Sequence, residues 1–442
     1  MSALARYFKS RGFHVAGYDR TTSVLSKDLE NEGIYVTYDD AQTAIPDTYL
    51  DKLHTLVVYT PAIHSEHPQL SWFRQQGFSI EKRAEVLGRV TQQLRSLCVA
   101  GTHGKTTTST ILAHLLYQSE IGCNAFLGGI SNNYDTNLLL NKESNLVVIE
   151  ADEYDRSFHH LTPYMAVVTS IDPDHLDVYG DATGYMEGFA HFAGLVHHGG
   201  VLLVHEGINF HPTLQKGVRY CTYSGNKVAD FYADNIKIGD GRITFDFHTP
   251  TEIISDMRLG APVKINIDNS VAAMAIAWLN GVTSNELRLG LSSYSGVYRR
   301  FNTLVRTNDY VLIDDYAHHP TELHASIDSV RALYPSKRIV GVFQPHLYTR
   351  TRDFAKDFAR ELSCLDSLIM LPIYPAREQP IDGVNSELIL SQCTCPEKRI
   401  CQKKDLIPLL LEQRGSVILT LGAGDIDRLV PQIAEALRKN ES

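Results

Sequence analysis

The chain has 442 residues, a formal net charge of −10 and a pI of about 6.0; this acidic balance disfavours a nucleic-acid partner held by phosphate contacts, though not a small anionic substrate. Hydrophobic residues make up 43% of the chain, and no apolar run approaches the ~20 residues that cross a membrane, so we expect a globular, cytoplasmic protein without a membrane partner. The length predicts two or three domains, and the odd number of cysteines, 7, argues against a disulfide framework.

The N-terminal segment has the pattern of a helix over residues 2–10 followed by a strand over 13–19 that ends in Asp19. In a nucleotide-binding βαβ unit, an acid at this position contacts a ribose, which makes Asp19 a candidate substrate ligand. Such a unit begins with a strand and a glycine loop, whereas this chain begins at the helix. We therefore expect the first strand and the loop that would bind a diphosphate to be missing from the sequence.

The next segment predicts strands over 53–59 and 78–80, and then a helix that begins at 82–85 and reaches about residue 93. Arg83 lies directly after the second strand. Basic residues in that position of a parallel sheet lie where ligands bind, so Arg83 is a candidate substrate contact. A solvated turn is the simpler alternative.

A short glycine loop, Gly101-x-x-Gly104-Lys105-Thr106, separates a buried strand ending at residue 100 from an apolar helical pattern. Glycines let the backbone N–H groups approach an anion closely, and the N-terminus of the helix adds a positive dipole end. Lys105 would reach the outer phosphates of a nucleotide, and Thr106 would bind the Mg²⁺ that accompanies them. Val99 replaces the first glycine of the usual phosphate-loop pattern, and the alternative is a strand-to-helix turn with an incidental lysine.

Acidic residues follow the next buried strand, which we place over 145–150. Glu150 ends the strand, and three more acids, Asp152, Glu153 and Asp155, follow it. Without a cation these acids would repel one another, so we predict a Mg²⁺ site there, with a solvated acidic turn as the alternative. His175 follows a further strand, over 165–171, and is predicted to be a metal ligand by its equivalent position.

The stretch from about 200 to 260 contains short alternating runs, beginning with 201–204, which we interpret as a small antiparallel insertion. Asn266 precedes an alanine-rich helix over 271–280. An asparagine there is usually a helix cap, but its amide can also recognise adenine, since it both donates and accepts hydrogen bonds. A domain boundary is expected near residues 293–296.

The C-terminal part predicts another α/β domain, with strands over 310–315, 338–343, 367–371 and 416–421. Acids and histidines follow the first of these strands, and His346, Arg350 and Arg352 follow the second. Arginines and a histidine beyond a strand end form a candidate anion site.

Taken in order, these blocks resemble the motifs of the Mur ligases, a family of ATP-dependent ligases of cell-wall precursor synthesis, over essentially the whole chain. The resemblance implies an α/β fold with three domains. It implies a Rossmann-like UDP-substrate-binding domain over 1–94, a central P-loop-type ATPase domain with a small β insertion over 95–296, and a Rossmann-like, amino-acid-presenting domain over 297–442. The blocks that carry it are 101–107, 150–155, 174–175, 299–301, 314–322, 344–346 and 349–353.

The same resemblance implies the reaction, in which L-alanine is joined to the lactyl carboxylate of UDP-N-acetylmuramate through an acyl phosphate, giving ADP and phosphate. Members that add later residues carry a carbamylated lysine, and no lysine lies between Asp177 and Leu214 here, as in the alanine-adding member. Ile265 departs from the histidine that the family often has before Asn266. Two alternatives stay open: a recycling ligase that attaches a ready-made murein tripeptide, and a nucleotide-binding regulatory protein with an inactive site.

The resemblance also implies roles for individual residues. For the ATP phosphates it implies Gly101, Thr102, His103, Gly104, Lys105, Thr106 and Thr107, with Arg300 near the γ-phosphate. It implies that Asn266 recognises adenine and that Asp315 contacts the ribose. It implies Thr106, Glu150 and His175 as the residues that bind Mg²⁺. For the UDP substrate and the amino acid it implies Asp19, Arg83, Tyr316, His319, His346 and Arg350. The residues it implies in catalysis are Lys105, His175, His319, Arg350 and Arg352.

Overall fold

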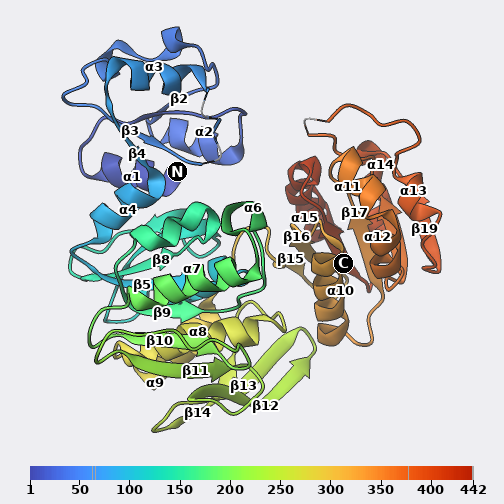
Figure 1. Cartoon of the computed structure of the whole chain (residues 1–442). Helices are drawn as coiled ribbons and strands as arrows, with labels where there is room; N and C mark the ends of the chain where they lie inside the picture. Colours follow the sequence, from blue (N-terminus) through green and yellow to red (C-terminus); the bar gives the residue numbers. More distant parts are fainter. Residues whose placement is uncertain (62, 65, 377, 441–442) are drawn as a thin grey trace. The chain divides into compact units, whose positions relative to one another are not determined.

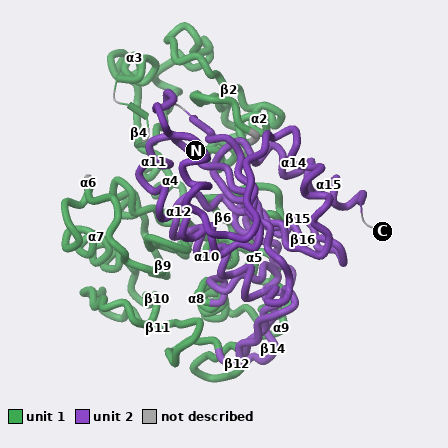
Figure 2. Tube along the Cα trace, turned by 90° about the vertical axis from the view of Figure 1, so that its right-hand side faces the viewer, with its two compact units in different colours: residues 1–233, 247–253, 268–290 green, residues 234–246, 254–267, 291–442 purple. Residues whose placement is uncertain are grey.

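The structure is a computed structural model that describes residues 1–440 except 62, 65 and 377. The chain forms two compact units, which Figure 2 shows in different colours. Unit 1 comprises residues 1–233, 247–253 and 268–290, and unit 2 comprises residues 234–246, 254–267 and 291–442.

The N-terminal part of unit 1 contains two small parallel sheets, β1-β2 and β3-β4 (Figure 1). The first helix spans the predicted residues, and its Ala3 and Leu4 pack in the main core of unit 1. The predicted first strand is shortened to three residues. The elements are α1 (Ser2–Ser10), β1 (Ala16–Tyr18), α2 (Val24–Asn31), β2 (Tyr35–Thr37), η1 (Gln42–Ala44), η2 (Asp47–Tyr49), β3 (Leu56–Tyr59), α3 (Pro68–Gln76), β4 (Ser79–Lys82) and α4 (Arg83–Thr91).

The central sheet of unit 1 is built around β5 (Arg95–Ala100), which pairs in parallel with β8 on one side and β9 on the other. Residues 96–100 of this strand are buried, as expected for a near-continuous apolar run in a parallel sheet. Because the three strands are parallel, their carboxyl ends meet at one edge of the sheet. The other elements here are α5 (Lys105–Tyr117), β6 (Asn124–Ser131), β7 (Thr136–Leu139), β8 (Leu146–Glu150), η3 (Tyr154–His160), β9 (Pro163–Val168), α6 (Leu176–Tyr179) and α7 (Ala182–Gly194).

The predicted antiparallel insertion is wrong in its first part. β10 (Val201–His205) pairs in parallel with β9, and β11 (Arg219–Ser224) pairs in parallel with β10, so both strands continue the central sheet. A short apolar or mixed run such as these does not by itself reveal strand direction. The boundary between the units runs through the next strands. The remaining elements of this region are β12 (Phe231–Gly239), β13 (Arg242–His248), β14 (Ile253–Arg258), α8 (Asn266–Leu279) and α9 (Ser284–Ser293).

Unit 2 contains a six-stranded sheet of order β15-β16-β20-β17-β18-β19, in which only the β15–β16 pair is antiparallel. An apolar core that includes Leu312, Val342 and Ile418 lies against it. The predicted strands are all present, shortened by one residue each. The elements are β15 (Asn302–Arg306), β16 (Val311–Asp315), α10 (Pro320–Leu333), β17 (Ile339–Phe343), α11 (Tyr348–Asp353), α12 (Ala355–Leu362), β18 (Ser367–Met370), α13 (Glu387–Leu390), β19 (Glu397–Ile400), α14 (Lys403–Leu411), β20 (Val417–Leu421), η4 (Asp425–Arg428) and α15 (Val430–Lys439).

Candidate functional site

The glycine loop follows β5, and two of its residues must be glycine. Gly101 has φ +137°, and a Cβ there would lie 2.0 Å from Thr169 Oγ1. Gly104 has φ +80° immediately before α5, and a Cβ there would lie 2.7 Å from Asn269 Oδ1. The absence of side chains lets the loop pass closely against two other segments.

The end of β9 holds the loop in place. The Ser170 carbonyl accepts a hydrogen bond from the Thr102 amide (3.2 Å), and the Ser170 hydroxyl accepts one from the His103 amide (2.9 Å). Thr102 Oγ1 donates to the Asp172 carbonyl at 2.8 Å. The first amides of α5 lack partners within their own helix, so this fixed loop presents an anion site at the positive end of a 13-residue helix.

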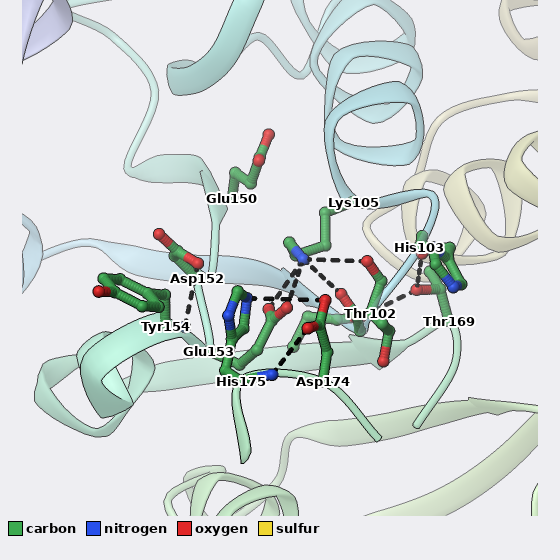
Figure 3. Close-up of polar contacts among 12 residues, drawn as sticks. Thr102, His103, Lys105, Glu150, Asp152, Glu153, Tyr154, Thr169, Asp174 and His175 are labelled. Carbon is green, nitrogen blue, oxygen red and sulfur yellow. Dashed lines mark hydrogen bonds and ion pairs between the residues drawn. The ribbon is translucent and has the colours of Figure 1, made fainter. Parts of the chain in front are cut away.

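Lys105 lies across this loop and forms a buried ion pair with Glu153 (Figure 3). Its Nζ donates to the Gly101 carbonyl at 2.6 Å and lies 2.8 Å from both carboxylate oxygens of Glu153. The two side chains are 14% and 2% exposed. Burial raises the pKa of Glu153, against the lowering effect of the Lys105 charge and hydrogen bond.

The acids after β8 have different partners in the structure, and the Mg²⁺ site predicted there stays a prediction. Glu153 pairs with Lys105, and Asp155 pairs with Lys82 at 2.7 Å. Asp152 accepts a hydrogen bond from the Tyr154 amide at 3.1 Å. Two lysines and a backbone amide therefore relieve the repulsion that we expected a metal to relieve.

Glu150 is the acid that faces the glycine loop. The Thr106 hydroxyl donates to Glu150 Oε1 at 3.0 Å, so two oxygen donors lie together at the start of α5. Gly128 of β6 leaves room for them, since a Cβ there would lie 2.1 Å from Glu150 Oε2. A carboxylate and a hydroxyl are ligands that suit Mg²⁺, so these two residues fit that ion.

His175, the third predicted metal ligand, does not contact Glu150. It lies 3.8 Å from Asp174 Oδ2, its ring centroid is 5.0 Å from that of Tyr154, and Figure 3 shows it beside Glu153. Within the described residues, no group of three or more His, Cys, Asp and Glu side chains is arranged to hold a metal. The metal role of His175 stays a prediction.

The predicted substrate residues of the N-terminal part, Asp19 and Arg83, both lie near the Met1 amine. Arg83 and Asp19 both act electrostatically on the Met1 amine, whose pKa is lowered to about 5 by burial first and by Arg83 second, against the raising effect of Asp19. Asp19 is exposed, and Arg83 is half-buried at the start of α4. Their positions leave both side chains accessible to a ligand.

The residues predicted to contact the nucleoside lie in unit 2. Asn266 is the first residue of α8; it is buried, and its amide donates to the Ala261 carbonyl at 3.1 Å. Asp315 accepts from the Ser326 hydroxyl at 2.7 Å, and burial raises the pKa of Asp315 to about 6. Arg300 is exposed, whereas its neighbour Arg299, which the prediction did not use, is buried.

The predicted anion site in unit 2 is partly assembled. Arg350 is close enough to His346 to lower the pKa of that imidazole, although burial lowers it most. Arg350 Nη1 and His346 Nδ1 are both buried without a hydrogen-bond partner. Two orphaned donors or acceptors in adjacent turns are groups that a bound amino acid could satisfy.

The other predicted residues nearby have different environments. His319 caps α10 with a weak, 3.4 Å hydrogen bond from the Thr321 amide. Tyr316 is exposed, and its ring packs against His318 at 5.0 Å. Arg352 pairs with Asp353 at 2.7 Å on the surface, and its role in the anion site stays a prediction.

Sequence reasoning missed four residues of the nucleotide region: Glu153 as the partner of Lys105, Ser170, Gly128 and Asn269. Asn269 lies one turn into α8, where its Oδ1 accepts from Thr108 at 3.1 Å. The spacing Asn266-x-x-Asn269 could have indicated that both side chains lie on one helix face. The contacts of the other three depend on neighbouring strands and leave no local signal.

Family models for Mur ligases match three consecutive parts of the chain. The Mur ligase family catalytic domain matches residues 1–95, the Mur ligase middle domain matches 99–277, and the Mur ligase glutamate ligase domain matches 299–424. Together they cover most of the sequence and agree with a three-domain α/β fold.

Two similar proteins are both described as UDP-N-acetylmuramate–L-alanine ligases. A UDP-N-acetylmuramate–L-alanine ligase of Parabacteroides distasonis is 55% identical over 99% of this chain and 95% of its own length. One of Porphyromonas gingivalis is 53% identical over 99% of this chain and 96% of its length.

Solved structures agree on the fold. The crystal structure of a UDP-N-acetylmuramate–alanine ligase from Thermotoga maritima has a TM-score of 0.81 at 22% identity, and it covers 100% of this chain and 97% of that one. A murein peptide ligase from Psychrobacter arcticus has a TM-score of 0.64 at 20% identity, over 99% and 96% of the two chains. Within the described part of the chain, no helix combines the length and apolar character needed to cross a bilayer.

Proposed function

This chain belongs to the Mur ligase family, and we propose that it joins L-alanine to the lactyl carboxylate of UDP-N-acetylmuramate in peptidoglycan precursor synthesis, with conversion of ATP to ADP and phosphate. The observation that supports it best is the nucleotide cradle: Lys105 across the glycine loop, with Thr106 and Glu150 together beside it. The similarity to L-alanine ligases over 99% of the chain supports the choice of substrates.

The loop residues would supply electrostatic stabilisation. The amides at the start of α5 and the Lys105 ammonium would bind the outer phosphates and stabilise the charge that develops as the γ-phosphoryl group moves to the carboxylate. When bound, Mg²⁺ would be held by Thr106 and Glu150, and it would neutralise phosphate charge.

The orphaned groups of unit 2 would receive the amino acid. Arg350 carries a fixed positive charge and a free, buried Nη1, which suits a carboxylate. The lowered pKa of His346 keeps its imidazole neutral near pH 7, so the ring can accept a hydrogen bond from the ammonium group of L-alanine. After the ammonium loses a proton to water, the free amine would attack the acyl phosphate, forming the C–N bond of the amide as the C–O bond to phosphate breaks; the released phosphate takes up the second proton. We propose a cytoplasmic reaction, because its nucleotide substrates belong there.

The test is phosphate release from ATP and Mg²⁺ with the two remaining substrates added separately and together. We expect release to require both UDP-N-acetylmuramate and L-alanine. Release only with the L-Ala-D-Glu-diamino-acid tripeptide would instead assign the protein to the recycling ligases. Absence of release with every acceptor, while ATP still binds, would support the regulatory alternative.

A further inference from the structure

The three N–H bonds of the Lys105 ammonium all have acceptors within the protein. Nζ donates to the Gly101 carbonyl at 2.6 Å, to Glu153 at 2.8 Å and, more weakly, to the Thr102 carbonyl at 3.4 Å. An ammonium has three donors and no acceptor, so none is left for a phosphate. A nucleotide must therefore displace at least one of these contacts, and the Thr102 carbonyl is the weakest.

Glu153 is held in place by an unusual segment. Asp155 and Arg156 follow it with φ of +53° and +55°, a left-handed conformation that is rare for two consecutive residues other than glycine. The segment is fixed by the Lys82–Asp155 ion pair at 2.7 Å, and by Tyr179, whose hydroxyl donates to the Glu153 carbonyl at 2.7 Å. Strain of this kind persists where the surrounding structure holds it, often at functional sites.

The charge of Glu153 is at first sight unfavourable for this site. A carboxylate beside a phosphate cradle repels the nucleotide. It is also almost completely buried, so complete withdrawal of Lys105 would leave a buried negative charge without a counter-ion, which is strongly destabilising. Both difficulties are avoided if the ammonium keeps its bond to Glu153 while it contacts the phosphate.

We propose that Glu153 is a positioning residue for Lys105: it holds the ammonium at the mouth of the loop and stays bonded to it when the outer phosphate displaces a loop carbonyl. Lys105 then bridges Glu153 and the γ-phosphate, and the carboxylate fixes the direction of its charge. This inference rests on the proposed function of the loop as a nucleotide cradle.

The decisive variant is Glu153→Gln, which keeps the size of the side chain and removes its charge. We expect the affinity for a non-hydrolysable ATP analogue with Mg²⁺ to rise threefold or more, because a repulsive charge is lost. We expect kcat to fall tenfold or more, because the ammonium is no longer held where charge develops. A purely structural role would instead weaken binding and turnover together.

Two further variants separate position from charge. Glu153→Asp keeps the charge but shortens the side chain, so we expect a loss of kcat without a gain in affinity. Asp155→Asn is the matched control: it removes a negative charge from the same segment, at a residue that pairs with Lys82 and not with Lys105. It should change the affinity for the ATP analogue and kcat by less than threefold each.

The proposal is overturned if Glu153→Gln leaves affinity and kcat unchanged, or if Asp155→Asn produces the same split. Melting temperatures of all variants are measured in parallel. Should Glu153→Gln fail to fold, Glu153→Asp with unaltered kcat would overturn the proposal. If the wild-type chain lacks ligase activity but binds the analogue, the proposed function fails, while the affinity change still tests the role of Glu153.

Discussion

At the scale of single residues, each of the two units contains a buried ion pair. Lys105 and Glu153 form such a pair in unit 1, and Arg299 and Asp314 form one in unit 2. Buried ions are costly unless they are paired and hydrogen-bonded, so each partner fixes the other in place. Removing one member should therefore affect stability as well as function.

The lysine of the glycine loop allows these two effects to be separated. Lys105→Met should abolish phosphate release, and it should also lower the melting temperature, because Glu153 loses its counter-ion. The double variant Lys105→Met/Glu153→Gln should recover the melting temperature but no activity. Turnover in either variant would refute the cradle assignment, which an assay of ADP formation beside differential scanning fluorimetry can decide.

The buried carboxyl of Asp315 should make stability depend on pH. Burial raises its pKa from 3.8 to about 6, so the folded state holds a proton that the unfolded chain releases between about pH 4 and 6. The free energy of unfolding should therefore fall by roughly 3 kcal/mol as the pH rises from about 4 through 6, because the pKa of Asp315 differs by about two between the unfolded and folded states.

The matched variant is Asp315→Asn, whose amide oxygen can still accept from Ser326. We expect the melting temperature of the variant, minus that of the wild-type chain, to be larger at pH 7 than at pH 4.5. Melting curves of both proteins at several pH values measure this difference. A difference between the two proteins that does not vary with pH would contradict the raised pKa.

At the scale of elements, the carboxyl ends of parallel strands create both candidate sites. In unit 1, β5 lies between β8 and β9, so the glycine loop, Glu150 and Ser170 come from three neighbouring strand ends. In unit 2, β20 lies between β16 and β17, whose ends lead to Asp315 and His346. Strand order thus decides which loops meet.

Arg299 connects such strand ends in unit 2. Its guanidinium donates to the Gly422 carbonyl at 2.6 Å and to Asp314 at 3.3 Å, so it joins the segment before β15 to the ends of β16 and β20. Arg299→Ala leaves Asp314 buried without a counter-ion and should cost about 3–5 kcal/mol. Arg299→Lys should be intermediate, because lysine lacks the planar fork.

The neighbouring Arg300 is exposed and provides the control for this prediction. Arg300→Ala should change the free energy of unfolding by less than about 0.5 kcal/mol, as is usual for surface residues. Thermal and urea denaturation can compare the three variants. Equal effects of Arg299→Ala and Arg300→Ala would show that the buried contacts of Arg299 are unimportant for stability.

At the scale of the whole molecule, the chain is a Mur ligase whose predicted phosphate-binding and amino-acid-binding residues lie in different units. Lys105, Thr106 and Glu150 belong to unit 1, and His346 and Arg350 belong to unit 2. Three family models match the chain in the order expected for this three-domain fold.

Nucleotide binding should stabilise the folded chain by mass action. A non-hydrolysable ATP analogue with Mg²⁺, present at 100 times its dissociation constant, should add about 2.7 kcal/mol to the free energy of unfolding. The resulting rise in melting temperature should shrink when EDTA removes Mg²⁺ and disappear in Lys105→Met. An equal rise with and without the metal would argue against a Mg²⁺ site at Thr106 and Glu150.

The sequence alone determined the class of fold, the glycine loop and the family. Buried strand segments such as 97–100 and 146–149 are indicated by continuous apolar residues, and the glycine loop is indicated by Gly101, Gly104 and Lys105 between a strand and a helix. These signals are local, because they arise from the backbone and from neighbouring side chains. They do not depend on how distant segments meet.

Only the tertiary structure decided which charges meet. Lys105 and Glu153 are 48 positions apart, and Lys82 and Asp155 are 73 positions apart. Sequence reasoning invoked a metal to relieve the repulsion among the acids after β8, because it could not see that two lysines lie beside them. The same limit explains the wrong direction of β10 and β11. Ion pairs and strand partners are set by strand order and register, which residues close in sequence do not encode.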